Sequence, residues 1–197
     1  MNAQRPGKGP RRRLDHGMTL VELLAVLSIL AILLGVGVPG MNRLVAGTRG
    51  SSSMMELHAL LGFARQSAIT MHREVTLCGT SNEVACSNTW DEKPTLVFVD
   101  ANRNRRADAS ERILLVSELT RSARIRWNAS GNRNYLRYRP DGGVAEYGNF
   151  TYCPANRDPR HARQIILSAT GRPRAAIDKD GDGIVEDRLG IPLNCDR

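Results

Sequence analysis

The stretch from Arg11 to Gly40, "RRRLDHGMTLVELLAVLSILAILLGVGVPG", joins a basic segment to a long apolar one. From Leu20 to Val38 the only polar side chains are those of Glu22 and Ser28. Nineteen helical residues extend roughly 28 Å, which is close to the hydrocarbon thickness of a bilayer. The pattern predicts a membrane-spanning helix whose basic flank stays in the cytoplasm while the rest of the chain is exported.

The position of the small residues distinguishes this segment from an ordinary secretory signal. The residues after the apolar core, "VPGMNRLVAG", make a poor cleavage site of the A-x-A type. Gly17 instead precedes the core, so cleavage after it would remove a basic leader, residues 1–17, and make Met18 the first residue. The apolar helix would then stay on the mature protein, which suits a subunit held in a membrane and later built into a fibre.

Glu22 is the one carboxylate in the apolar segment. An ionised side chain in a membrane-spanning helix costs about 3 kcal/mol and is usually paired and functional. Once Met18 is the first residue, its amine lies four residues before Glu22 and on the same helix face. The amine of a neighbouring subunit could pair with Glu22 equally well, which would set the register of an assembly.

The residues from Gly17 to Pro39 resemble the prepilin signal of type IV pilins and type II secretion pseudopilins. The resemblance implies that a prepilin peptidase cleaves after Gly17, that Met18 is N-methylated, that Glu22 acts in assembly, and that Pro39 breaks the helix. It also implies an inner-membrane protein with one membrane pass and a periplasmic C-terminal domain, which joins other major and minor pilins in an extracellular pilus. An ordinary signal anchor is the alternative.

The chain of 197 residues suits a single anchored domain. We expect a leader over residues 1–17, a membrane and filament-core helix over 18–47, and a globular domain over 48–197. The leader carries five positive residues and one negative residue, so its removal lowers the net charge from +8 to +4. Lysines are few among the 28 basic residues, and arginine favours bidentate phosphate contacts, although compositional bias explains the preference equally well.

The remainder of the chain predicts an α+β fold. Apolar residues recur at helical spacing from Met54 to Met71, which indicates an amphipathic helix over residues 53–72, after a weak or hinge-like Gly/Ser-rich stretch. Short β-like runs follow at residues 74–78, 95–100, 112–119, 123–127, 134–140, 143–148 and 163–171. One helix packed on antiparallel sheet matches the type IV pilin architecture. Residues 55–177 more loosely resemble the FimT/GspH group of minor pilins and pseudopilins.

Four cysteines in an exported chain predict two disulfides with three possible pairings. Cys78 and Cys86 bracket a short turn-rich loop, so we expect them to pair. Cys153 would then bind Cys195 and hold the C-terminal tail against the domain. A zinc site is disfavoured because no C-x-x-C pair is present.

The "GRPR" segment, Gly171 to Arg174, is the main candidate binding site. Gly171 permits a tight turn, and Pro173 stiffens the backbone between Arg172 and Arg174. In an extended chain, both arginine side chains could then bind neighbouring phosphates. A G-R-x-R near the C-terminus resembles the motif by which FimT-type minor pilins bind DNA, which implies double-stranded DNA as a partner. A turn with exposed arginines is the alternative. Three further arginines precede the segment and would extend the surface: Arg157, Arg160 and Arg163.

An acidic segment, "DKDGDGIVED", suggests calcium as a cofactor. Asp178, Asp180 and Asp182 match the first half of an EF-hand loop, but the twelfth position is Leu189 instead of glutamate. Glu186 could substitute in a non-helical loop, and a solvated acidic turn is the default. We expect no enzyme, because no nucleophile with a base and an orienting acid emerges, and no phosphate-cradling glycine loop is present.

These features predict a minor type IV pilin that binds extracellular DNA through its backbone for uptake in natural transformation. Two alternatives stay within the same superfamily: an assembly-priming or tip pilin for adhesion and twitching, and a type II secretion pseudopilin of the GspH type. A third alternative is an exported binding domain that is stabilised by calcium and carries a prepilin-type N-terminal anchor without being a pilin.

Overall fold

The computed structural model describes residues 19–88, 90, 93–118 and 124–196, and only the backbone of residues 36–47. The chain divides into two compact units, Met1–Asn42 and Arg43–Arg197. The predicted boundary after residue 47 stays a prediction. No helix among the described residues is both long enough and apolar enough to cross a membrane.

One helix, α1, runs from Leu20 to Met71. Thr19 caps its start, because the Thr19 hydroxyl accepts a hydrogen bond of 3.2 Å from the backbone N–H of Glu22. A threonine followed three residues later by a glutamate is the pattern of a capping box, and an acid in the first turn also complements the helix dipole. Glu22 therefore has a local role at the helix start beside its predicted role in assembly. The predicted partner of Glu22, Met18, lies outside the described residues, as does Gly17.

The expected interruption of the helix at Pro39 is wrong. The backbone is helical from residue 20 to residue 71 and continues through Pro39 and the Gly/Ser-rich stretch. Gly50 has a packing role here, since a side chain at this position would collide with the ring of Tyr152 and approach the carbonyl of His161. The glycine that suggested a hinge instead allows α1 to pass close to the sheet.

The second half of α1 is amphipathic as predicted. Met54, Leu57, Leu61, Ala64 and Ala68 are buried, whereas His58 and His72 are exposed. The helix ends in a Schellman motif with His72 in the left-handed region at φ 52°. The N–H of His72 donates to the carbonyl of Ile69, and the N–H of Arg73 donates to the carbonyl of Ala68.

Eight strands form two antiparallel sheets of four strands each among the described residues. The first has the order β3-β2-β1-β5, with β1 at Val75–Gly79, β2 at Thr95–Val99, β3 at Ile113–Ser117 and β5 at Tyr135–Tyr138. The second has the order β4-β6-β7-β8, with β4 at Arg124–Ala129, β6 at Gly148–Cys153, β7 at Arg163–Leu167 and β8 at Pro173–Ala175. The α+β prediction is confirmed.

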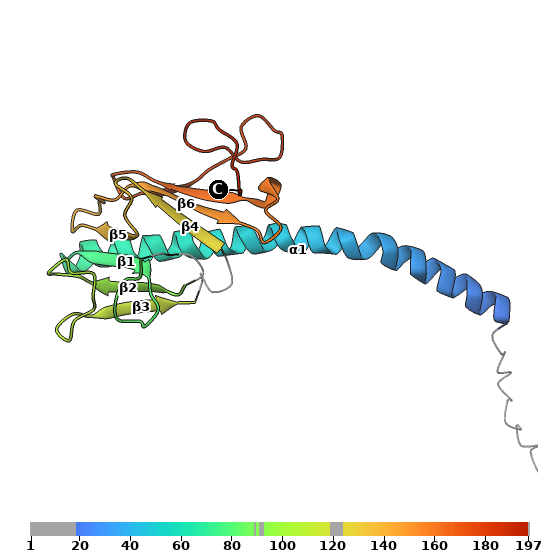
Figure 1. Cartoon of the computed structure of the whole chain (residues 1–197), viewed down its shortest axis with the longest axis horizontal. Coiled ribbons are helices and arrows are strands. Elements are labelled where there is room, and N and C mark those ends of the chain that lie inside the picture. Colours follow the sequence, from blue (N-terminus) through green and yellow to red (C-terminus); the bar gives the residue numbers. More distant parts are fainter. Residues whose placement is uncertain (1–18, 89, 91–92, 119–123, 197) are drawn as a thin grey trace, which may run out of the picture. The chain divides into compact units, whose positions relative to one another are not determined.

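Both sheets pack on the second half of α1. In Figure 1, β1–β3 lie on one side of the helix and β4 and β6 lie on the other. One buried cluster joins the helix stripe to Val75 and Leu77 of β1, and to Ile125, Phe150 and Ile165 of the second sheet. The alternate residues of β1 face the other way, where Cys78 packs with Leu96, Phe98 and Tyr135.

Two strands were missed and one predicted strand is wrong. Residues 143–147 form no strand and make only an isolated bridge between Val144 and Tyr138, because the chain crosses there from one sheet to the other, and Gly148 begins β6. β6 follows at Gly148–Cys153, "GNFTYC", where no strand beyond Gly148 is predicted from the sequence. β8 is three residues long at the edge of its sheet, where Pro173 is tolerated.

Both predicted disulfides are confirmed, Cys78–Cys86 and Cys153–Cys195. Around the second, a small buried cluster gathers Cys153, Ala162, Val185, Leu193 and Cys195. The C-terminal segment is therefore held by a covalent bond and by its own apolar contacts.

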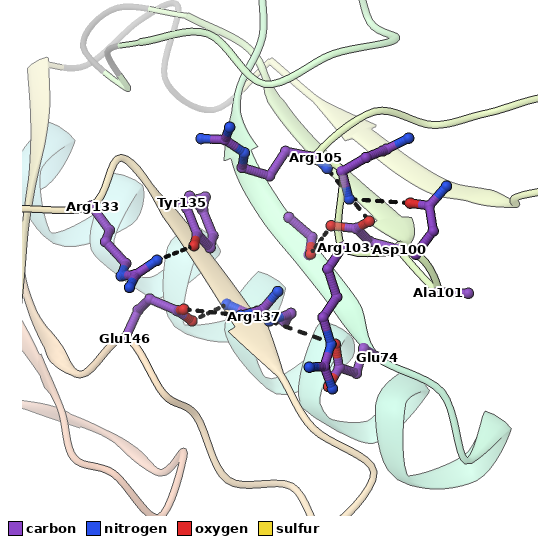
Figure 2. A network of polar contacts seen from close by, with 12 residues as sticks. Glu74, Asp100, Ala101, Arg103, Arg105, Arg133, Tyr135, Arg137 and Glu146 are labelled. Carbon is purple, nitrogen blue, oxygen red and sulfur yellow. Dashed lines mark hydrogen bonds and ion pairs between the residues drawn. The ribbon is translucent and has the colours of Figure 1, made fainter. Parts of the chain in front are cut away.

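A buried ion-pair network supports the first sheet (Figure 2). Arg137 on β5 lies between two carboxylates, with nitrogen–oxygen distances of 3.4 Å to Glu146 and 3.6 Å to Glu74. The side chain of Glu146 is only 2% exposed, that of Glu74 is 14% exposed and that of Arg137 is 16% exposed. Arg103 binds Glu74 at 2.7 Å from the solvent side, with its own side chain 64% exposed.

Substitution Arg137→Met is expected to lower the free energy of unfolding by roughly 3–5 kcal/mol, because it leaves the buried Glu146 carboxylate without its cation. Chemical denaturation of the full chain, with disulfides intact, measures the loss. Arg103→Met is the matched control and should change stability far less, since Arg103 is exposed. Equal effects of the two substitutions would contradict the assignment.

Removing the disulfides should cost unequal amounts of stability. The Cys153–Cys195 bond spans 42 residues and the Cys78–Cys86 bond spans 8. Loop-closure entropy then predicts that paired Cys→Ala substitutions lower the free energy of unfolding by about 4 kcal/mol for the first bond and about 2.6 kcal/mol for the second. The same denaturation measurement tests the order, and a larger loss at Cys78–Cys86 would refute it.

Candidate functional site

Gly171 forms the turn that presents the two arginines of the "GRPR" segment. Its φ is +73°, in the left-handed region, and its N–H donates to the carbonyl of Ser168 at 2.9 Å. A side chain at this position would collide with the carbonyl of Gly142 and crowd the ring of Tyr138. The turn therefore needs glycine both for its backbone conformation and for its close packing.

α1 holds the neighbouring turn in place. Arg65 Nε donates a hydrogen bond of 2.9 Å to the carbonyl of Gly142, which is the group that Gly171 packs against. The N–H of Val144 donates to the carbonyl of Ala169 at 3.0 Å and ties the two turns together. The position of the "GRPR" segment thus depends on a contact between the helix and residues 142–144, which the sequence motif does not reveal.

Arg172 lines an open hollow of about 530 Å³ with two further arginines, Arg65 and Arg139. Asp141 is the one acid among the described residues of the lining, and it binds Arg139 at 3.2 Å. The N–H of Gly143 and the guanidinium of Arg139 together lower the pKa of Asp141, so this carboxylate stays ionised. The hollow still has an excess of positive charge, which suits an anionic group.

Arg174 belongs to the outer edge strand β8, where it is exposed and opposite Ile166 of β7. Successive residues of a strand face opposite sides of the sheet. Arg174 therefore lies on the face opposite to Pro173 and Ala175. No carboxylate among the described residues pairs with the side chain of Arg172 or Arg174.

The three arginines that precede the segment have different surroundings. Arg163 begins β7 and lines a groove with Met54 and Met55 of α1 and with Ala175, so it lies on the face opposite to Arg174. Its guanidinium donates to the carbonyls of Arg160 and Ala162. Arg157 and Arg160 are exposed around a short 3-10 helix, Pro159–His161. The structure does not place Arg163 on the same face as Arg174.

The acidic segment brings three of its four predicted ligands together. Oxygen atoms of Asp178, Asp180 and Glu186 lie within 4.8 Å of one another, whereas Asp182 is not part of this group. Backbone N–H groups already donate to these carboxylates, from Gly181 and Gly183 to Asp178 and from Lys179 to Glu186. Hydrogen bonding within the loop accounts for its shape, and calcium binding stays a prediction.

The similar acidic loop at residues 100–108 is arranged around its own amides. The side chains of Asn102 and Asn104 donate to Asp108 at 2.8 and 2.7 Å and lower the pKa of that carboxyl. Asp100 is fully buried and accepts from the hydroxyl of Thr76 at 2.9 Å. Because the amide nitrogens of Asn102 and Asn104 already donate to Asp108, these hydrogen bonds stabilise the loop itself.

Comparisons with known proteins add independent findings. The sequence model of the family described as type II transport protein GspH matches residues 53–171, and that of the prokaryotic N-terminal methylation motif matches residues 12–38. No curated protein sequence matches the chain.

Two crystal structures of the type IV minor pilin FimU from Pseudomonas aeruginosa are similar to this structure. One has a TM-score of 0.50 at 19% identity and covers 74% of this chain and 93% of that one. The other has a TM-score of 0.49 at 18% identity and covers 64% of this chain and 92% of that one. The first of these likenesses supports a shared fold.

Substitution Gly171→Ala is expected to lower the free energy of unfolding by roughly 2–5 kcal/mol, because it adds backbone strain and a collision with Gly142. Gly181→Ala is the matched control: its φ is +81°, but nothing lies within 4 Å of the added carbon. The control should lose only the strain, about 1–2 kcal/mol. Thermal or chemical unfolding measures both, and equal losses would exclude the packing role of Gly171.

Proposed function

Because the chain belongs to the family of the type II transport protein GspH, and is a minor type IV pilin or a GspH-like pseudopilin, we propose that it enters a pilus and captures extracellular double-stranded DNA there. Binding is to the phosphate backbone, without sequence specificity, and serves DNA uptake in natural transformation. The observation that carries the proposal is the pair Arg172 and Arg174, which are exposed and without acidic partners among the described residues.

The form of the "GRPR" segment supports phosphate binding. Pro173 fixes the backbone angle between the two arginines and close packing against Gly142 holds the turn at Gly171, so the backbone loses little conformational freedom on binding. Their guanidinium groups offer planar pairs of donors that match phosphate oxygens. The excess positive charge around Arg172, from Arg65 and Arg139, raises the local potential for an anion.

The N-terminal unit supports incorporation into a filament. The methylation motif implies that a prepilin peptidase processes the chain, and membership of the family implies assembly with other pilins. Large apolar side chains are exposed along α1 from Leu20 to Leu34. A helix that is apolar on all sides needs an apolar surrounding. In this proposal the surrounding is the inner membrane before assembly, with the globular domain in the periplasm, and the helices of other subunits afterwards.

DNA binding is tested with the full chain in detergent and with its disulfides intact. Fluorescence anisotropy follows binding to a random-sequence duplex across a salt series. The double variant Arg172→Ala/Arg174→Ala should bind at least tenfold more weakly, and its salt slope should fall by about 1.8, because two phosphate contacts are lost. Arg106→Ala/Arg188→Ala is the matched control, since it removes equal charge from two other exposed arginines.

The outcomes separate the alternatives. Retained affinity in the Arg172→Ala/Arg174→Ala variant, or an equal loss in the control, would show that the "GRPR" segment is not the DNA site. No DNA binding by the unsubstituted chain would favour an assembly-priming pilin or a secretion pseudopilin.

A further inference from the structure

A second basic hollow lies at the seam between the two sheets, away from the "GRPR" segment. Its volume is about 440 Å³, within the range of small-molecule sites. Residues of β4 and its connection to β5, of the loop after Cys86 and of the loop after β2 line it: Asn88, Trp90, Arg105, Arg126, Trp127, Asn132, Arg133 and Asn134. Among the described residues, the lining thus combines arginines, asparagines and an aromatic wall, and contains no acid.

Three arginines line this hollow, and the described part of the chain provides no carboxylate that pairs with them. None of Arg105, Arg126 and Arg133 pairs with a carboxylate among the described residues. Asp91 and Glu92, the acids nearest to Trp90 in the sequence, lie outside those residues. Unpaired like charges that gather around one hollow repel one another, and an anion that enters it would relieve the repulsion.

Two of these arginines are held in place by Tyr135. The guanidinium carbons of Arg105 and Arg133 lie 5.6 and 5.8 Å from the centre of its ring, and Arg133 also donates to its hydroxyl at 2.6 Å. Figure 2 shows both arginines near Tyr135, with Arg137 beside them. Arg137 is also 5.7 Å from the ring centre but is neutralised by Glu74 and Glu146. Arg105 and Arg133 contact the same ring but have no carboxylate partner among the described residues, so their charges are available to a ligand.

The surrounding backbone is rigid as well. The carbonyl of Arg105 accepts from the N–H of Cys86 at 3.0 Å, so the Cys78–Cys86 disulfide loop fixes the Arg105 loop. Trp127 is stacked on Phe150 at 4.2 Å, and its indole N–H donates to the carbonyl of Tyr135. The side chain of Asn134 donates to the carbonyl of Ser87 at 2.6 Å, which leaves its oxygen as an acceptor. A site built in this way loses little entropy when a ligand binds.

We propose that this hollow binds one uronate unit of an acidic polysaccharide. The arginines bind its carboxylate, the asparagines bind its hydroxyls, and the edge of Trp127 contacts the apolar face of the sugar ring. Hydroxyl groups need both donors and acceptors, which asparagine amides supply, whereas a phosphate has acceptors only and gains nothing from the amide oxygens. The amides thus favour an acidic sugar over a nucleic-acid phosphate. This site is independent of the proposed DNA site.

The chain contains a built-in reporter for the test, because its two tryptophans, Trp90 and Trp127, both line the hollow. Intrinsic fluorescence of the full chain in detergent is titrated with trigalacturonate and with the neutral α-1,4-linked galactose trimer. We expect a saturable change with trigalacturonate and at least tenfold weaker binding of the neutral trimer. Arg126→Gln should weaken trigalacturonate binding roughly tenfold, since it removes a charged hydrogen-bond donor.

Controls make the proposal falsifiable. Arg126 is exposed and has no partner to lose among the described residues, so its substitution should fold normally. Arg106→Gln removes a neighbouring exposed arginine outside the hollow and should bind like the unsubstituted chain, as should Arg172→Ala/Arg174→Ala. Equal binding of the two trimers, or equal loss in Arg126→Gln and Arg106→Gln, overturns the proposal. Tighter binding of inorganic phosphate or duplex DNA than of trigalacturonate, by the same fluorescence signal, overturns the sugar assignment.

Discussion

The apolar stripe of α1 from Met54 to Ala68 is the contact on which the globular unit depends. Two four-stranded sheets pack against this stripe, and their inner side chains join its residues in a single buried cluster. Before this stripe, Gly50 lets the helix approach Tyr152 closely. After it, the Schellman motif at His72 ends the helix. The "GRPR" segment and the hollow at Arg105 both belong to sheets and loops whose positions depend on that helix.

The two basic regions differ in how they are built. Arg172 is exposed just before the short edge strand β8 and Arg174 is exposed on it, and one glycine turn packed on Gly142 precedes both. Such an open arrangement suits a long polyanion with regularly spaced charges, such as the phosphate backbone of duplex DNA. The hollow at Arg105 and Arg133 is instead formed by several loops and stabilised by Tyr135. Convergent side chains of this kind suit a compact ligand with mixed polar groups.

Burial explains why some arginines are excluded from both regions. Arg137 is partly buried and neutralised by two carboxylates, so it stabilises the first sheet and is not free for a ligand. Arg163 donates to two backbone carbonyls and faces α1. In the sequence these residues look like Arg172 or Arg126, because a run of arginines does not indicate which of them has a partner. Pairing across strands decides the difference.

Local patterns, namely hydrophobic periodicity and cysteine spacing, were enough to predict the prepilin-like N-terminus, the amphipathic half of α1, most strands and both disulfides. Three features emerge only from the folded chain: α1 continues through Pro39, residues 148–153 form an interior strand, and residues 143–147 form none. The candidate sites followed the same division. "GRPR" is a contiguous motif and was visible, whereas the hollow at Arg105 joins residues up to 46 positions apart in the chain, from Asn88 to Asn134. Such a site exists only once the sheets pack, because packing, and not the sequence order, brings its side chains together.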